Sequence, residues 1–184
     1  MLAELILDFL PWPGSGEKSK ERGDALMGKA LGGAVLVDPH RADAIKDALA
    51  ENGMLAEQVI AAGDLRQGKE PSLASMITGT ALIEVLRPRR SKSVPRHFVL
   101  AVTDDRVVAF GAVGGGEEDG PYEVWVRPGE RGSWPREGVR LVETSMGQKS
   151  WSGELVLGSE RIPVFRPGSD TDPSTNELIE LLAG

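Results

Sequence analysis

The densest group of residues that could bind a ligand is a basic run at residues 87–96. It reads Arg-Pro-Arg-Arg-Ser-Lys-Ser-Val-Pro-Arg, and its five cationic side chains are those of Arg87, Arg89, Arg90, Lys92 and Arg96. Guanidinium groups present forked donors that match the oxygens of a phosphate or carboxylate. Two interpretations stay open. The run binds an anion such as a lipid headgroup, or it is a Pro-stiffened, solvated loop whose charges are screened by salt. Convergence of the five side chains on one concavity would favour anion binding.

Other candidate motifs lack a residue that their chemistry needs. The segment Gly14–Ser19 is similar to a phosphate-binding loop, but Glu17 stands where such a loop needs glycine, directly before its lysine. Asp38, His40 and Asp43 lie close together at an expected helix start, yet the segment offers no further ligand for a metal ion. The chain has no cysteine, which excludes disulfides and cysteine nucleophiles. We therefore expect no metal, no cofactor and no catalytic residues.

His97 follows the basic run directly and is one of two histidines in the chain. It begins an expected strand, where it is either an ordinary edge residue or a group that senses pH or phosphate. An enzyme that combines His97 with acidic side chains distant in sequence stays an alternative. Our main interpretation is a non-enzymatic binding or scaffolding module that recognises a protein or peptide partner, with anion binding by residues 87–96 as the alternative.

Large aromatic residues are candidates for contact with a protein or peptide partner. Alternation along a strand places Tyr122 and Val126 on one face and Trp125 on the other, so one of these faces is less buried. Trp151 is expected in the core. Trp125 and Trp134 are either core residues or anchors for a partner, because aromatic side chains dominate interface hot spots.

Composition sets bounds on partners and location. The chain has 184 residues, of which 40% are hydrophobic, enough to bury a core. Its formal net charge of −7 argues against a protein that coats nucleic acid or anionic membrane through general charge. We expect no nucleic-acid partner. The N-terminal run Met1–Leu10 lacks a basic start, and no apolar run approaches the roughly 20 residues of a membrane-spanning helix. We therefore expect a cytoplasmic protein without a transmembrane segment, whose oligomeric state the sequence leaves open.

A change in composition near residue 77 predicts a domain boundary. Residues 1–76 are expected to form a small helical region, with a Pro-, Gly- and Ser-rich linker near residues 11–23. Capping residues and apolar spacing predict helices at residues 24–31, 38–51 and 54–62. Residues 34–37 are ambiguous between strand and helix.

The second region, residues 77–184, is rich in β-branched and aromatic runs separated by turns. Within it, residues 97–113 form two apolar segments hinged at Thr103-Asp104-Asp105, which predicts an antiparallel hairpin. The seven predicted strands lie at residues 81–87, 98–102, 107–113, 122–127, 139–144, 151–157 and 161–165. A capped amphipathic helix from Asp172 to Ala183 follows. The expected fold class is α+β, with a β-barrel or sandwich after the helical region.

Seven short antiparallel strands followed by one C-terminal amphipathic helix resemble the pleckstrin-homology-like (PH-like) fold, over about residues 77–184. The hairpin resembles that of bacterial PH-like domains, whose threonine and arginine are matched by Thr103 and Arg106. The resemblance implies a partly open barrel with the terminal helix plugging one end. It also implies a domain that binds lipids, peptides or proteins rather than an enzyme. In PH domains that bind inositol phosphates, the loop at the place of residues 87–96 supplies the basic residues.

Overall fold

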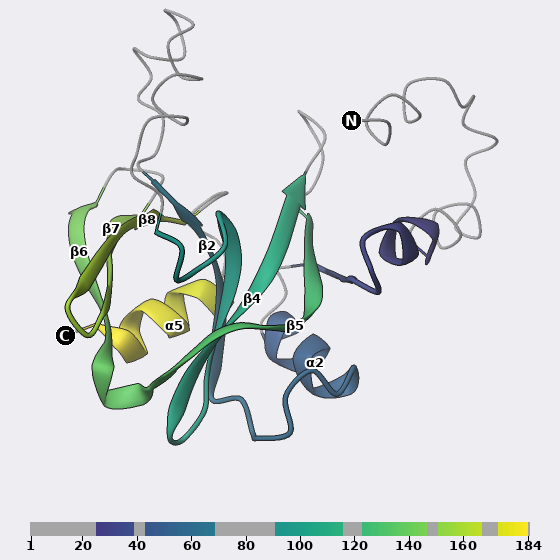
Figure 1. Cartoon of the computed structure of the whole chain (residues 1–184), viewed down its shortest axis with the longest axis horizontal. Coiled ribbons are helices and arrows are strands. Elements are labelled where there is room, and N and C mark those ends of the chain that lie inside the picture. The colour runs from purple at the N-terminus through teal and green to yellow at the C-terminus, as the bar shows by residue number, and fades with distance from the viewer. Residues whose placement is uncertain are drawn as a thin grey trace, which may run out of the picture.

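The computed structural model describes residues 25–38, 43–68, 91–115, 123–146, 151–166 and 173–183, with an additional short helix at residues 25–30. The elements, labelled as in Figure 1, are β1 (Val35–Val37), α2 (Ala44–Glu51), β2 (Ala61–Gln67), β3 (His97–Val102), β4 (Arg106–Gly115), β5 (Glu123–Pro135), the 3-10 helix η1 (Arg136–Gly138), β6 (Val139–Met146), β7 (Trp151–Leu157), β8 (Glu160–Phe165) and α5 (Pro173–Leu182). In these ranges no helix combines the length and the apolar character needed to cross a membrane.

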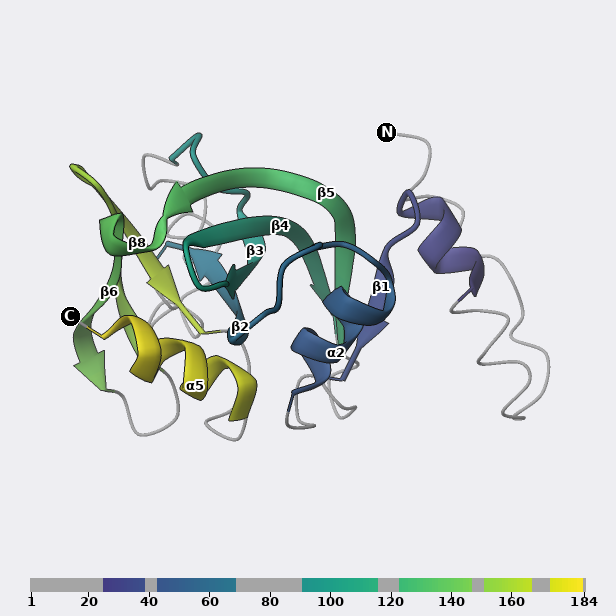
Figure 2. The ribbon, with the colours of Figure 1, turned by 90° about the horizontal axis from the view of Figure 1, so that it is seen from below.

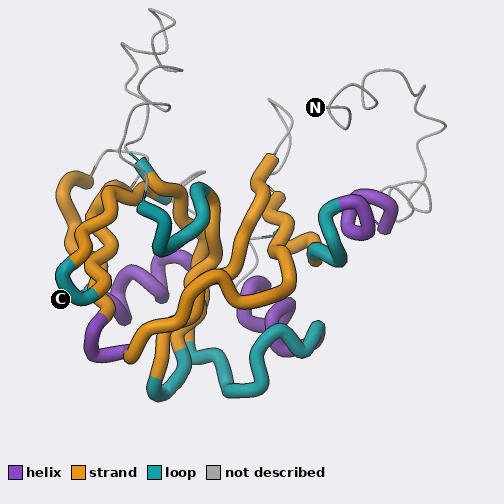
Figure 3. The backbone as a smooth tube through the Cα atoms, in the orientation of Figure 1, coloured by secondary structure: helices purple, strands orange, loops and turns teal. Residues whose placement is uncertain are grey.

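One eight-stranded antiparallel sheet organises the fold. Its strands, orange in Figure 3, curl into a half-barrel. Its strand order is β1-β5-β4-β3-β2-β8-β7-β6. Strand β2 pairs with β3, β3 with β4 and β4 with β5. In the second run, β6 pairs with β7 and β7 with β8. The two runs meet at a narrow seam, where β2 pairs with β8 only through Arg66 and Gln67. The rest of β2 has no partner strand on that side within the described chain, which leaves room for α5 (Figures 1 and 2).

The central strands are buried on both faces of the sheet. Phe98 and Leu100 of β3 belong to the hydrophobic cluster that includes α5, whereas Val99 and Ala101 belong to the cluster that includes α2. Successive side chains of a strand point to opposite faces, so a strand covered on both sides needs apolar residues at every position. This explains the unbroken apolar run of β3. Figure 2 shows the two helices at separate parts of the curled sheet.

Helix α5 fills the gap beside the seam by direct contact with β2. A Cβ atom added to Gly63 would lie 2.8 Å from the Thr175 Cα and 2.9 Å from a Leu178 methyl carbon, so only glycine allows this approach. A backbone group on the unpaired edge of β2 also gains a hydrogen-bond partner there: the Asp64 N–H donates to the Thr175 hydroxyl at 2.9 Å. Leu178 and Leu182 are buried. The helix therefore takes the place that a longer β8 would occupy.

Five of the strands match the sequence predictions closely, and the sixth, β5, continues to Pro135, eight residues beyond its predicted end at residue 127. Strands β3 to β8 and the hairpin between β3 and β4 are confirmed, with Thr103 N–H bonded to the Arg106 carbonyl across the turn. The ambiguous residues 34–37 supply β1. The seventh predicted strand, residues 81–87, lies outside the described residues, as does the predicted linker at residues 11–23.

Two predictions are corrected by the structure. Residues 54–62 do not form a helix: residues 54–60 are irregular, and Ala61 begins β2. Tertiary packing overrides the local pattern there, because the small residues of β2 are buried between β3 and α5. The sheet has eight strands in the described chain rather than seven, since β1 and β2 come from the region expected to be helical. The boundary near residue 77 therefore does not divide the sheet.

Helix α2 matches the C-terminal part of the helix predicted at residues 38–51. It begins at Ala44, after Asp43 in a left-handed conformation, and residues 39–42 of the predicted helix lie outside the described residues. Its end agrees with the prediction, because the Asn52 side chain donates to the Ala48 carbonyl and Gly53 has a φ of 58°. Residues next to each other in the sequence therefore determine the C-terminal end of this helix.

Replacement of Gly63 tests the contact between β2 and α5. We expect Gly63→Ala to lower the free energy of unfolding by about 1–3 kcal/mol, because the new methyl group meets helix backbone that must shift. Gly138→Ala is the matched control, since a Cβ there meets nothing within 4 Å. Urea unfolding of both variants measures the difference. Equal stabilities would show that α5 does not pack closely on β2.

Candidate anion-binding site

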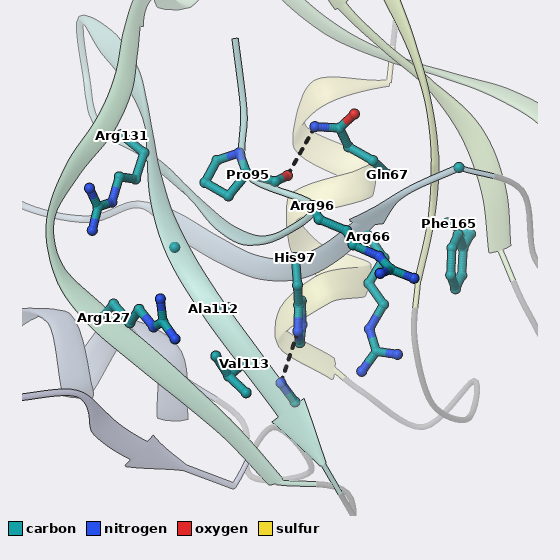
Figure 4. A pocket seen from close by; sticks show the side chains of 13 residues that line it. Arg66, Gln67, Pro95, Arg96, His97, Ala112, Val113, Arg127, Arg131 and Phe165 are labelled. Atoms are coloured by element: carbon teal, nitrogen blue, oxygen red, sulfur yellow. Dashed lines mark hydrogen bonds between the residues drawn. The ribbon is translucent and has the colours of Figure 1, made fainter. Parts of the chain in front are cut away.

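A cavity of about 830 Å³ opens at the start of β3 (Figure 4). Its charged lining residues are the four arginines Arg66, Arg96, Arg127 and Arg131, joined by His97. Residues 111–114 of β4 contribute small side chains or none. No Asp or Glu is among the described residues that line it. The cavity is therefore a local concentration of positive charge in an acidic protein.

One wall of the cavity depends on an irregular pairing between β4 and β5. Phe110 is opposite Glu130 and Ala112 is opposite Val126, so several residues of β5 face Gly111 alone. Such bulges re-aim side chains. Because Gly111 has no side chain, the Arg127 and Arg131 side chains lie over it: a Cβ there would be 3.8 Å from the Arg127 Cδ and 3.7 Å from the Arg131 Nε. Two arginines four positions apart thus reach the same cavity.

The opposite wall is formed by β2 and the segment before β3. Arg66 is paired with His97 on one side and Phe165 on the other, near the end of β2. The Gln67 N–H donates to the Arg96 carbonyl at 2.8 Å, which continues the pairing of β2 beyond β3. Figure 4 shows Arg66 and Arg96 on one side of His97, and Arg127 and Arg131 on the other.

The side chain of Gln67 holds the segment that carries Arg96. Its amide nitrogen donates to the carbonyls of Val94 at 2.6 Å, Pro95 at 3.1 Å and Ser91 at 3.2 Å. Its amide oxygen accepts the Ser91 N–H at 3.1 Å. These four contacts from one side chain replace the backbone strand pairing that residues 91–95, with Pro95, do not form. Gln67 therefore fixes the backbone just before Arg96.

Glu160 fixes the same segment from β8. Its carboxylate accepts a hydrogen bond from the Ser93 hydroxyl at 2.5 Å. Hydrogen bonds from Ser91 and Ser93 lower the pKa of the Glu160 carboxyl, because they stabilise its charged form. The carboxylate thus holds the segment without lining the cavity.

Three of the four cavity arginines differ in their partners from Arg106 and Arg161. Arg106 bonds to Glu57 and Glu130, and Arg161 bonds to Glu154. Within the described ranges, Arg96, Arg127 and Arg131 form no ion pair with a carboxylate, and the Arg127 Nε is buried without a hydrogen-bond partner. Guanidinium groups arranged in this way are ready to donate to an anion.

His97 lies between the two walls and has both ring nitrogens engaged. Its Nε2 is 2.5 Å from a carboxylate oxygen of Asp64, which is 1% exposed. Its Nδ1 accepts the Gly114 backbone N–H at 2.9 Å. A nitrogen that accepts cannot carry a proton, so the ring is the neutral tautomer with its proton on Nε2, directed to Asp64. The bond to Gly114 is needed because β4 extends past the start of β3, so this side of β4 has no β3 residue opposite it, whereas its other side pairs with β5.

The basic run predicted as a binding site contributes one residue to the described cavity. Arg96 lines it, whereas Lys92 is exposed and does not. Arg87, Arg89 and Arg90 lie outside the described residues. The sequence analysis missed the three other arginines, which come from separate strands: Arg66, Arg127 and Arg131. The Pro128-Gly129 pair inside β5 was the available signal, since it marks the irregularity that re-aims two of them.

The three tryptophans in the described part of the chain are at least partly covered. Trp151 is 5% exposed, which confirms its prediction as a core residue. Trp125 is half-buried. Its ring lies 3.3 Å from the position that a Cβ atom on Gly28, in the helix at residues 25–30, would take. Trp134 lies over Gly132 and packs against the cluster that includes α5. Trp125 is on the opposite face of β5 from the buried Val126, as alternation predicted.

Comparisons with protein-family models, with curated proteins and with solved structures found no match to this chain. The geometry of the cavity is therefore the basis for its interpretation.

Removal of the Gln67 amide tests how the wall containing Arg96 is held. We expect Gln67→Ala to lower the free energy of unfolding by about 2 kcal/mol, through loss of several hydrogen bonds. The Ser91 amide should also exchange faster with solvent. Gln58→Ala, at an exposed loop position, is the control. Unchanged protection of Ser91 would contradict the anchoring role.

Glu160 should make stability depend on pH in the acid range. Its lowered pKa means that its hydrogen bonds stabilise the fold above the ordinary Glu pKa of about 4.3. That contribution is lost as the pH falls through the folded-state pKa. We expect Glu160→Gln to be less stable than the parent at neutral pH, with the difference shrinking toward about pH 3. Glu143→Gln, at an exposed position, controls for the loss of one negative charge. A constant difference across this range would contradict the assignment.

Proposed function

We propose that this protein is a non-enzymatic binding module that holds a phosphate-bearing anion in the arginine cavity. The observation that carries the proposal is the lining itself: four guanidinium groups from two opposite walls, with no carboxylate among the described lining residues. Like charges are costly to gather unless a counter-charge binds between them. Forked donors on both sides suit an anion with several oxygens.

Binding is favoured over catalysis by what the cavity offers. The described lining contains no serine, threonine, lysine or carboxylate that could act as nucleophile or general base. Both ring nitrogens of His97 are already engaged. An enzyme that uses His97 would have to break one of these contacts first.

The fold gives further support to a PH-like module. Apart from β1, seven strands follow one another in sequence and are succeeded by α5, the arrangement that the resemblance implies. The first of them is β2, so such a module would begin near residue 61 rather than 77. PH-like domains are binding domains, and the basic segment before β3 stands where their inositol-phosphate ligands are held. A cytoplasmic location is part of this proposal.

A protein or peptide partner has less support than an anion. Leu26, at 70%, is the single exposed large hydrophobic side chain among the described residues, and protein-binding surfaces usually carry larger apolar patches. Trp125 and Trp134, the aromatic candidates for such a surface, are partly covered by the chain itself.

Titration with a soluble inositol polyphosphate, and with vesicles that do or do not contain phosphatidylinositol phosphates, tests the proposal. We expect binding at low salt that weakens as salt is added. Arg127→Ala and Arg131→Ala should each weaken it about tenfold, because each removes a charged donor. Arg161→Ala is the matched control, since Arg161 pairs with Glu154 and does not line the cavity.

The two arms separate the sources of the ligand. Binding to the soluble polyphosphate alone indicates a free ligand, and binding to the phosphorylated vesicles as well indicates a membrane headgroup. Absence of binding in both arms at low salt, or equal losses in Arg161→Ala and Arg127→Ala, would contradict anion binding in the cavity.

A further inference from the structure

His97 is in a position to couple the charge of the cavity to pH. Its ring is almost buried, with a side chain 11% exposed, yet it lines the cavity between the two arginine walls. Its Nδ1 is an acceptor for a backbone N–H rather than for a side chain. The Nδ1 atom is therefore the one place in the ring where a second proton can be added.

We propose that protonation of His97 is a switch that strengthens anion binding in the cavity. The proposal rests on the proposed function. A proton from solvent adds to the Nδ1 lone pair, and the existing Nε2–H stays directed to Asp64. The ring then carries a positive charge, and Nδ1 changes from acceptor to donor. It can no longer accept the Gly114 N–H, so this bond breaks.

The released groups face the anion. Nδ1–H and the Gly114 N–H repel each other, so the ring and the end of β4 separate, and both become donors without an acceptor. Gly114 and His97 both line the cavity, which places the new donors beside the arginines. A bound anion accepts from them and balances the added charge. Acidification therefore changes both the charge and the donor count of the site.

Charged groups of both signs surround His97. Asp64, from β2, pairs with the ring. Arg66 from β2, Arg96 from the preceding segment, and Arg127 and Arg131 from β5 line the same cavity. The described lining residues of β4 carry no charge. An anion bound among the arginines attracts the positive charge of a protonated ring, so anion and proton must favour each other's binding by the same factor.

The experiment measures affinity for inositol hexasulfate, whose sulfate groups stay ionised throughout the range, from about pH 8 to about pH 5. We expect the parent to bind about tenfold more tightly at the acid end, the value of one added charged hydrogen bond. His40→Gln should show the same rise, because it removes the other histidine of the chain. His97→Gln should lose it, since glutamine can donate to Asp64 but does not titrate.

A spectroscopic measurement on the parent protein supports the same test without a variant. NMR of the ring nitrogens should show the Nε2–H tautomer at high pH, and the Gly114 amide should lose protection from exchange as the ring is protonated. Addition of inositol hexasulfate should make the ring take up its proton at higher pH.

Three results would overturn the switch. Binding with equal affinity at both ends of the pH range refutes it while leaving anion binding intact. An unchanged rise in His97→Gln assigns the effect to another group and also refutes it. Absence of inositol hexasulfate binding at every pH refutes the switch together with the proposed function.

Discussion

The burial of Asp64 is the constraint on which both the fold and the cavity depend. A carboxylate that is 1% exposed must be satisfied by the protein itself, because an unpaired buried charge is very costly. Its side chain accepts a hydrogen bond from the His97 ring, and its backbone N–H donates to the Thr175 hydroxyl of α5. Since side chain and backbone of one residue engage different elements, the position of α5 and the orientation of His97 are set from a single point on β2. The His97 bond to Gly114 extends this to the end of β4.

The narrow seam between β2 and β8 explains why this arrangement is available. A full pairing of the two strands would satisfy the edge of β2 with backbone groups and leave no place for a helix. Pairing at Arg66 and Gln67 alone leaves that edge open, and α5 occupies it against Gly63. Lys46 of α2 reaches Glu177 of α5 at 2.9 Å, beside the same opening. This ion pair connects two helices that pack against different hydrophobic clusters.

The sequence predicted the parts of the fold whose signals are local. Strands β3 to β8 were found because apolar runs and turn residues lie next to each other in the chain, and α5 because its cap and apolar positions are adjacent. Strand β2 was missed because its small residues give no local strand signal. They pair with β3, and Gly63 also contacts α5, and both elements are far away in sequence. The cavity was missed for the same reason. Arg66 and Arg131 lie 65 positions apart in the sequence, and only the strand order brings them to the same cavity.

The contrast between the acidic chain and its basic cavity determines which anions would bind. The formal net charge of −7 repels anions at a distance, whereas the arginine cavity attracts them nearby. At physiological ionic strength these effects act over about 8 Å, so an approaching anion responds mainly to the cavity once it is close. Long-range steering, which an overall basic protein gives to any polyanion, is absent from such a design. Discrimination then depends on how many donors an anion engages across the two walls, which favours compact ligands with several phosphate oxygens over extended polyanions that contact one wall.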